Sequence, residues 1–323
     1  MSNFLQILAD GIAVGALYAL VALGYTLVYG ILQFINFAHS DIFALGAWIS
    51  LTSAAAVGLA SAFGAALPPF YLTLLVLLSS IAVCGLMGFI IERFAYRPLR
   101  NAPRLNVLIT AIGVSLLLQN IGQLEIFRIR NDQGMTLYSL PFGPYPRVMP
   151  QMLPQDAVNV LGIQFNSIDL IVLAVALVIM IGIELLIFRT KIGLAMRAVS
   201  FNHRTAALMG VNVDRVISFT FVLGAMLAGA AGFLYCVKYP QLRQTADTMW
   251  VLFGLKAFVA AVVGGIGNVR GAMLGGLCIG LIEYLGVTYI SGNYRDVYVF
   301  SILILVLLIR PSGILGKTTV EKV

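Results

Sequence analysis

Long runs of apolar residues follow one another along this chain, and they predict helices that cross a membrane. A run of about 20 apolar residues spans the bilayer core as a helix. Membrane β-strands would instead be short segments that alternate apolar and polar residues. Some runs can be broken or re-entrant, so we expect about eight or nine crossings. They are placed at roughly 11–32, 36–58, 70–91, 105–127, 167–188, 215–237, 248–266, 271–290 and 296–309.

Composition agrees with this pattern. The chain has 323 residues, of which 60% are hydrophobic and 10% are charged, whereas soluble domains carry about 25% charged residues. A water-soluble fold would lack the polar residues to cover its surface. The sequence therefore predicts an all-α fold, a polytopic membrane helix bundle that forms a single transmembrane domain over residues 1–323.

The basic residues predict which connections face the cytoplasm. They concentrate in 93–104, 189–215 and the tail after 310, and cytoplasmic connections of membrane proteins are enriched in Lys and Arg. We therefore place these segments and the C-terminus in the cytoplasm. The net charge of +7 follows from this enrichment, and no nucleic-acid partner is expected. No Lys or Arg precedes Arg93, so charge leaves the side of the N-terminus open.

The longest polar stretch, near 128–166, then falls on the outer, periplasmic side. It is rich in Pro and Gly, which favour turns over a regular helix. Two interpretations stay open for it: a docking surface for a soluble partner, or a long loop.

Small residues recur every four positions in two of the apolar runs. Such spacing lets helices approach closely in lipid, and it predicts a tightly packed bundle. The positions are Gly224, Ala228 and Gly232, then Gly271 and Gly275, then Gly276 and Gly280.

A short helix near 193–210 is predicted on the cytoplasmic side. Gly210 suits a left-handed cap at its C-terminal end. Its apolar residues are mostly alanines, which bury little area in lipid, so docking into a groove of another protein is favoured over a helix lying on the headgroups. The candidate contact residues are Ala195, Arg197, Ala198, His203, Arg204, Ala206, Ala207, Met209 and Gly210.

Motifs for catalysis or nucleotide binding are not found. Gly316-Lys317-Thr318 resembles the end of a phosphate-binding loop, but Pro311 stands where that motif needs its first glycine. With only His39 and His203, no catalytic or metal-ligand constellation emerges. We expect no enzyme, no metal and no cofactor bound by this chain.

Several long motifs, in the right order, resemble the bacterial branched-chain amino acid ABC transporter permeases of the LivH type. They cover nearly the whole chain apart from the loop near 128–166. Ser40 departs from the family, which usually has glycine there. The matching segments are 15–39 (GALYALVALGYTLVYGILQFINFAH), 92–100 (ERFAYRPLR), 106–120 (NVLITAIGVSLLLQN), 203–225 (HRTAALMGVNVDRVISFTFVLGA), 255–277 (LKAFVAAVVGGIGNVRGAMLGGL) and 310–316 (RPSGILG).

The resemblance implies a permease subunit of an importer in the bacterial inner membrane. Such a subunit pairs with a second, related permease, and two cytoplasmic ATPase subunits, which bind ATP and Mg, drive the pair. A periplasmic amino-acid-binding protein delivers leucine, isoleucine or valine. The family's cytoplasmic coupling helix maps onto Gly193–Gly210, and ATP would bias an alternating-access equilibrium.

Polar groups inside the spans are the candidates for the translocation path, because ionisable groups in a membrane usually face a cavity or a partner. Each also has a structural interpretation: Lys256 could pair with Glu283, and Glu184 lies five residues from Arg189. Near 36–41 we expect a broken helix that borders the path. The candidates are Tyr25, Tyr29, Asn36, His39, Asp41, Lys256 and Glu283.

Other functions remain open at this point. A urea or short-amide permease would use the same scaffold. A channel or carrier acting alone would need no ATPase, but it would leave the 193–210 helix without a purpose. A third alternative is a scaffold subunit whose partner forms the whole path.

Overall fold

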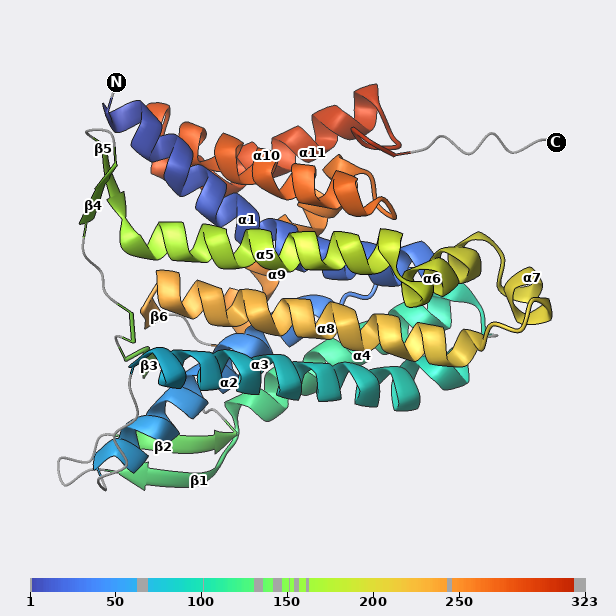
Figure 1. Ribbon diagram of the computed structural model, residues 1–323, viewed down its shortest axis with the longest axis horizontal. Coiled ribbons are helices and arrows are strands. Elements are labelled where there is room, and N and C mark those ends of the chain that lie inside the picture. Colours follow the sequence, from blue (N-terminus) through green and yellow to red (C-terminus); the bar gives the residue numbers. More distant parts are fainter. Residues whose placement is uncertain are drawn as a thin grey trace. The chain divides into compact units, whose positions relative to one another are not determined.

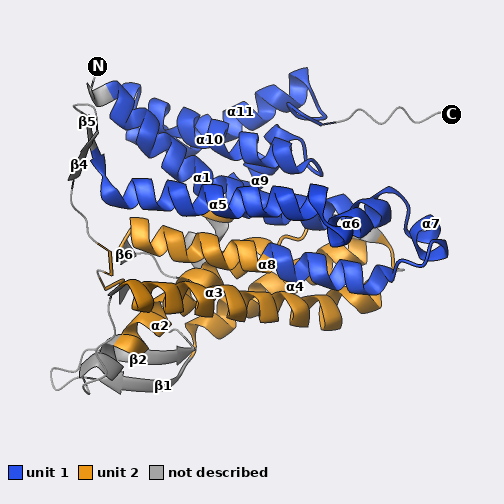
Figure 2. Ribbon diagram, viewed as in Figure 1, with its two compact units in different colours: residues 1–35, 156–224, 255–323 blue, residues 36–155, 225–254 orange. Residues whose placement is uncertain are grey.

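The chain forms two compact units, each built from segments that are distant in the sequence. In the computed structural model, unit 1 comprises residues 1–35, 156–224 and 255–323, and unit 2 comprises 36–155 and 225–254 (Figures 1 and 2). Helices α8 (Val213–Lys238) and α9 (Ala246–Gly264) each contribute to both units. The structure describes residues 2–62, 69–100, 102–130, 136–141, 147–150, 152–153, 157–160, 163–242 and 246–316.

Within these described ranges, eight helices are long and apolar enough to cross a membrane. A shorter apolar helix, Leu252–Gly264, lies in α9. These helices confirm the predicted polytopic helical fold, including its eight or nine apolar segments. The prediction of one domain over residues 1–323 stays a prediction.

Unit 1 is built on the packing of α1 (Ser2–Leu32) along α10 (Val269–Tyr289). Small residues make this packing close. A β-carbon added to Gly280 would lie 2.3 Å from the Cα of Gly15, and one added to Gly276 would lie 2.4 Å from the backbone nitrogen of Ala19. The four-residue spacing of Gly276 and Gly280 therefore brings two backbones together, as predicted for helices in lipid.

The remaining elements of unit 1 define its two ends. Helix α5 (Ser167–Arg189) packs on α1, and α11 (Arg295–Ile309) follows α10 through a short helix at Gly292–Tyr294. Strands β4 (Ala157–Val160) and β5 (Ile163–Asn166) form a hairpin at one end.

Helices α6 (Lys191–Phe201) and α7 (His203–Leu208) lie at the other end of unit 1 (Figure 1). The beginning of α1 lies at the β5 end of this unit, away from α6 and α7 (Figure 1). The side of the N-terminus, which charge left open, is thus opposite to that of the basic α6–α7 segment.

Unit 2 contains α2 (His39–Ala62), α3 (Pro69–Ile91) and α4 (Arg104–Gln123), with a π-turn at Glu92–Tyr96 and a 3₁₀ turn at Arg97–Leu99 after α3. Its core is also held by small residues, because a β-carbon added to Gly46 of α2 would lie 2.7 Å from the Cα of Gly229 in α8, closer than van der Waals contact. The Ser80 hydroxyl of α3 lies 2.9 Å from the carbonyl oxygens of both glycines. Close backbone contact and a buried hydroxyl thus join three helices.

The stretch 128–166 contains short antiparallel strands that the sequence analysis did not predict. In unit 2, β1 (Glu125–Arg130) pairs with β2 (Thr136–Pro141), and β3 (Arg147–Val148) pairs with β6 (Gln241–Leu242). The aromatic and β-branched residues of these segments fit a pleated ladder. Pro and Gly favour turns in a sequence, but they do not reveal which short segments pair.

The predicted break near residues 36–41 overlaps the irregular backbone between α1 and α2, although residues 39–41 are helical. Helix α1 ends at Leu32 and α2 begins at His39, with irregular backbone between them. Gln33 has a φ of 55°, a left-handed conformation that non-glycine residues rarely adopt.

Ser40, which stands where the family resemblance leads us to expect glycine, is accommodated by a glycine elsewhere in unit 2. A β-carbon added at Gly254 would lie 1.9 Å from the Cβ of Ser40, well inside contact distance. The Ser40 hydroxyl donates to the carbonyl oxygen of Phe37 at 3.1 Å.

This contact makes Ser40 and Gly254 dependent on each other. Gly254→Ala is expected to lower the free energy of unfolding by about 1–3 kcal/mol, the usual cost of overpacking. Adding Ser40→Gly should restore a large part of that loss, because it removes the clashing carbon. Thermal unfolding of the two single variants and the double variant checks this. Equal damage from Gly254→Ala with and without Ser40→Gly would contradict it.

Candidate translocation and coupling sites

Asn36 lies at the helix break of unit 2 and is 2% exposed. The hydroxyl of Tyr96, in the π-turn after α3, donates to its side-chain oxygen at 2.6 Å. Its side-chain nitrogen has no hydrogen-bond partner among the described residues. A buried amide with an open donor is costly unless another group binds it, so Asn36 keeps its place among the path candidates.

Asp41, in the first turn of α2, is buried in the same unit. The side-chain nitrogen of Gln119 in α4 donates to one carboxylate oxygen at 2.9 Å, and Gln119 also contacts Ser115 at 3.2 Å. The other carboxylate oxygen has no partner within the described part of the chain. His39, at the start of α2, is also buried. The structure thus gathers all three polar candidates of the break in one unit.

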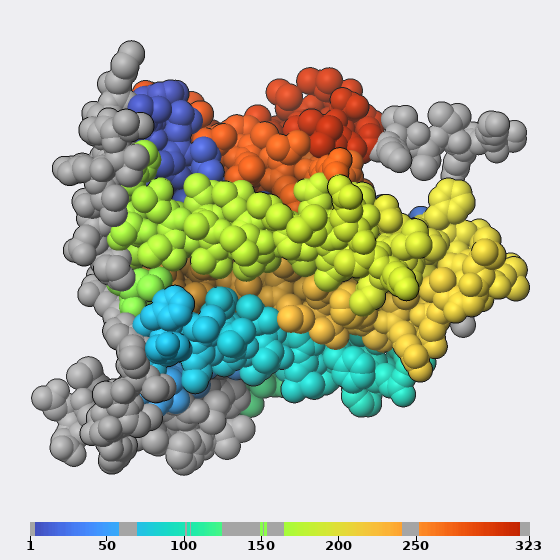
Figure 3. Space-filling view, in the orientation of Figure 1, coloured from blue at the N-terminus to red at the C-terminus, as the bar shows by residue number. Residues whose placement is uncertain are grey.

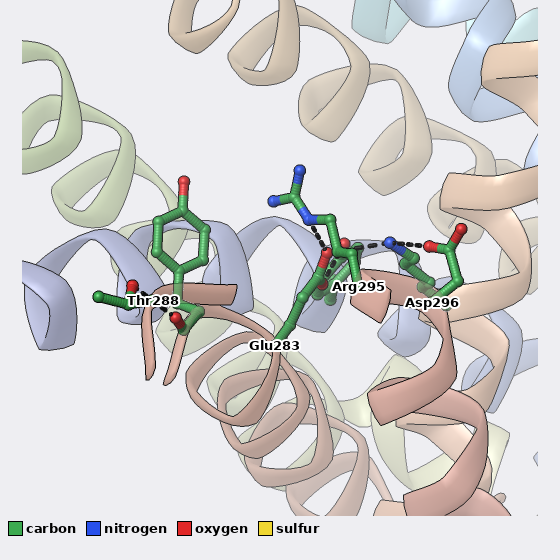
Figure 4. A network of polar contacts seen from close by, with 7 residues as sticks. Glu283, Thr288, Arg295 and Asp296 are labelled. Carbon is green, nitrogen blue, oxygen red and sulfur yellow. Dashed lines mark hydrogen bonds and ion pairs between the residues drawn. The ribbon is translucent and has the colours of Figure 1, made fainter. Parts of the chain in front are cut away.

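Glu283 is the centre of a network of charged residues in unit 1. Its carboxylate is fully buried and accepts hydrogen bonds from Tyr18 at 2.7 Å and from Lys256 at 2.9 Å. Arg295 also donates to it, and Figure 4 shows its guanidinium directed at the Glu283 carboxylate. Lys256 reaches Asp296 at 2.6 Å as well. Four elements, α1, α9, α10 and α11, meet in this network.

In this network the cationic side chains of Lys256 and Arg295 contact the carboxylates of Glu283 and Asp296. Lys256 and Glu283 are nearly excluded from solvent, whereas Arg295 and Asp296 remain about half exposed. Buried charges are tolerated when they are paired and hydrogen-bonded. The pairing of Lys256 with Glu283, foreseen as the structural alternative, is present, and it favours a role for both residues in holding unit 1 together.

The aromatic candidates lie in the last two turns of α1. Tyr25 is buried, and its ring meets that of Phe258 edge-on with centroids 5.8 Å apart. Tyr29 is half-buried, next to the glycine-rich turn between α9 and α10. Both residues belong to unit 1, whereas Asn36 and Asp41 belong to unit 2.

Glu184 pairs with Arg270, and not with Arg189, which lies five residues away in the sequence. Its carboxylate accepts from Arg270 at 2.8 Å. The Arg270 guanidinium also lies 4.9 Å from the ring centroid of Phe188. Glu184 thus joins α5 to the start of α10 as a structural group.

The segment near 193–210, predicted to be one cytoplasmic helix, is two helices and not one. It begins as α6 at Lys191 and breaks at Asn202, whose backbone is extended. The Asn202 side chain accepts from the backbone N–H of Thr205 at 3.0 Å, which makes it the N-cap of α7. The single-helix prediction was wrong because it overlooked this cap. Gly210 has a φ of 84°, as predicted for a left-handed end.

Large apolar side chains, more than alanines, form the exposed face of this segment. Phe201 is 93% exposed, Leu208 88% and Met209 81%, and Figure 3 shows the yellow atoms of α7 projecting past the end of α5. Ala206 is buried and faces inward. The sequence analysis did not select Phe201 and Leu208. Large apolar residues within a basic connection could have indicated an exposed contact surface.

The other predicted coupling residues divide between the two faces. Arg197 lies with its guanidinium 5.5 Å from the ring centroid of Phe188, and a ring nitrogen of His203 contacts the Ile31 carbonyl oxygen of α1. These two side chains therefore make contacts inside unit 1. Four others are at least partly exposed: Ala195, Ala198, Arg204 and Ala207.

Comparison with known proteins gives a consistent result. The family model described as branched-chain amino acid transport system / permease component matches residues 7–309. The high-affinity branched-chain amino acid transport system permease protein BraD of Pseudomonas aeruginosa is 39% identical over 328 residues, covering 99% of this chain and 98% of the relative.

A second bacterial relative, the high-affinity branched-chain amino acid transport system permease protein LivH of Escherichia coli, is 38% identical over 323 residues, with 99% and 98% coverage. The probable LivH permease of Methanocaldococcus jannaschii is 28% identical over 327 residues, with 96% and 92% coverage. No solved structure matches this chain at a significant level. The chain therefore belongs to the family of permease components of branched-chain amino acid transport systems.

Proposed function

We propose that this chain is the membrane-spanning permease subunit of an ATP-driven importer for leucine, isoleucine and valine. Its similarity to BraD and LivH over nearly the whole length of both chains carries the proposal. The eight long apolar helices fit a permease. The chain itself hydrolyses no ATP in this scheme, because partner ATPase subunits bind ATP and Mg.

The partners follow from this assignment. A second, related permease completes the membrane part, and two ATPase subunits dock on the cytoplasmic side at α6 and α7. A periplasmic binding protein delivers the amino acid at the side of the 128–166 segment. The bacterial inner membrane holds the complex, with the C-terminus of this chain in the cytoplasm. The concentration of Lys and Arg in the connections at that side supports this orientation.

We place the path at the helix break of unit 2. An amino acid with an aliphatic side chain needs mostly apolar walls and a few polar groups for its ammonium and carboxylate. Asp41 has a carboxylate oxygen and Asn36 an amide nitrogen without partners among the described residues. The carboxylate suits the ammonium and the amide suits the substrate carboxylate. In this scheme His39 borders the path in unit 2. Tyr25 and Tyr29 stay path candidates of unit 1, and Lys256 and Glu283 have a structural role within unit 1.

Reconstitution with the neighbouring gene products tests the proposed function. The complex in proteoliposomes should take up leucine, isoleucine and valine only when ATP and the binding protein are present. ATP hydrolysis should rise with these amino acids and not with urea. Stimulation by urea alone would instead identify a urea permease, and uptake by this chain without ATPase subunits would identify a channel or carrier.

The exposed face of α6 and α7 gives a separate prediction. Leu208→Asp and Phe201→Ser are each expected to weaken binding of the ATPase subunits about 30-fold, as removal of a central apolar anchor does in other interfaces. Both side chains are almost fully exposed, so the stability of the permease should be unchanged. Co-purification and a binding titration measure the effect.

A matched control is Ile290→Asp, which changes a 73% exposed residue just after α10, at the hairpin end of unit 1. That variant should bind the ATPase subunits normally. Equal binding by the wild type and Leu208→Asp would contradict docking at this face.

A further inference from the structure

The C-terminal end of α1 is completed by side chains from α6 and α7. The last carbonyl groups of a helix have no partner within the helix. At α1, the backbone N–H of Gln33 satisfies the carbonyl of Tyr29 at 2.8 Å. The Ser200 hydroxyl donates to the carbonyl of Gly30, and His203 contacts that of Ile31 at 2.8 Å. Three successive carbonyls are thus bound, two of them by the cytoplasmic segment.

The His203 contact has a defined direction. A carbonyl oxygen only accepts hydrogen bonds, so the Nε2 atom of His203 must carry the proton and donate it. A glutamine side chain has a comparable donor, whereas alanine has none. Replacing His203 by glutamine should therefore keep the hydrogen bond to Ile31, whereas replacing it by alanine should remove the bond.

Ser200 and His203, together called the α1 clamp, lie on either side of the break at Asn202. Ser200 belongs to the last turn of α6, and His203 is the first residue of α7. Asn202 caps α7 and so sets the angle at which the second helix leaves the first. Both helices therefore hold the end of α1 at once.

Helix α7 thus contacts α1 through one side chain and exposes large apolar side chains elsewhere. His203 reaches α1, whereas Leu208 and the adjacent Met209 are exposed. The same end of α1 also lies near the turn between α9 and α10, because a β-carbon added to Gly30 would be 3.7 Å from the carbonyl oxygen of Gly267. A displacement of α7 would therefore act on a helix end that is held on several sides.

We propose that the α1 clamp transmits movement of the α6–α7 segment to α1. Ser200 and His203 are then positioning residues: they hold the helix end that leads into the break at Gln33, and they do not contact the ATPase. The inference rests on the proposed function, because the movement comes from ATPase subunits bound at α6 and α7. It changes the role of His203 from docking residue to internal connection.

The double variant Ser200→Ala and His203→Ala tests the clamp in the reconstituted complex. ATPase binding and ATP hydrolysis should stay as in the wild type. The number of amino acids imported per ATP should fall roughly fivefold, at the lower end of usual coupling between sites. His203→Gln, which keeps a donor, should retain most of the wild-type ratio. Thr288→Ala removes a comparable bond, to the carbonyl of Tyr284 at 2.9 Å, and should leave the ratio unchanged.

A second measurement separates the clamp from the proposed function. Hydrogen–deuterium exchange in the permease alone should be several-fold faster at the amides of 29–33 in the double variant. Should the wild-type complex import nothing, the proposed function fails, and faster exchange would still support the clamp. Unchanged exchange, an unchanged import ratio or loss of ATPase binding in the double variant would each overturn it.

Discussion

The Glu283→Gln variant is expected to lose about 3–5 kcal/mol of stability, the usual cost of removing one partner from a buried ion pair. Glutamine has nearly the same shape but no charge. Among the described residues, it would leave Lys256, which is 8% exposed at its side chain, with the half-exposed Asp296 as its one counter-ion. Arg295 would also lose its carboxylate partner. Thermal unfolding of the protein in nanodiscs measures the loss.

A double variant shows whether charge balance is the cause. Glu283→Gln together with Lys256→Met removes one charge of each sign, so Arg295 and Asp296 remain as a neutral set. The double variant should be about 2 kcal/mol more stable than the sum of the two single effects predicts, within the usual range for contacting residues. Strict additivity would mean that shape, and not charge, explains the loss.

A matched control for the same network is Glu184→Gln. It also neutralises a paired glutamate in unit 1, but the Glu184–Arg270 pair is much more exposed. Exposed pairs contribute about 0–1 kcal/mol, so this variant should unfold close to the wild type. A loss as large as that of Glu283→Gln would show that burial is not the deciding factor.

The Gly280→Ala variant is expected to destabilise unit 1 by about 3 kcal/mol, at the upper end of the cost of overpacking. Its added β-carbon would lie 2.3 Å from the Cα of Gly15 and 2.5 Å from the carbonyl oxygen of Gly11. Both neighbours are backbone atoms and cannot rotate away, so α1 and α10 must separate. The yield of folded protein and its unfolding temperature should both fall.

The control for this variant is Gly182→Ala in α5. No atom lies within 4 Å of a β-carbon added there, and alanine favours a helix over glycine by about 1 kcal/mol. Gly182→Ala should therefore be neutral or slightly stabilising. If Gly280→Ala were equally well tolerated, the close packing of α1 on α10 would be wrong.

The spans were predictable because each consists of about 20 consecutive apolar residues, a signal that depends on no distant contact. The break after α1 was predictable for the same reason, since Asn36, His39 and Asp41 interrupt the apolar pattern. The pairing of β3 with β6 was not, because it joins residues far apart in the sequence, such as Val148 and Gln241.

The candidate sites divide in the same way. Intramembrane polar residues are visible in a sequence as exceptions, and the pairing of Lys256 with Glu283 was foreseen. Their further partners Tyr18, Arg295 and Asp296 come from other elements, so only packing reveals them. The predicted coupling helix had the right place and the right C-terminal glycine. Its Asn202 break was missed, because an asparagine within a helical pattern becomes a cap only when the backbone turns there.

Unit 1 joins the first helix of the chain to the last ones, and this arrangement sets an order for biosynthesis. Tyr18 and its partner Glu283 are separated by 265 residues. At about 5–20 residues per second, α1 enters the membrane roughly 13–53 s before the ribosome has made the helix that covers its glycine face. Membrane helices insert as independently stable units before they associate. A nascent chain interrupted before residue 255 would thus hold α1 in the bilayer with its small-residue face turned to lipid.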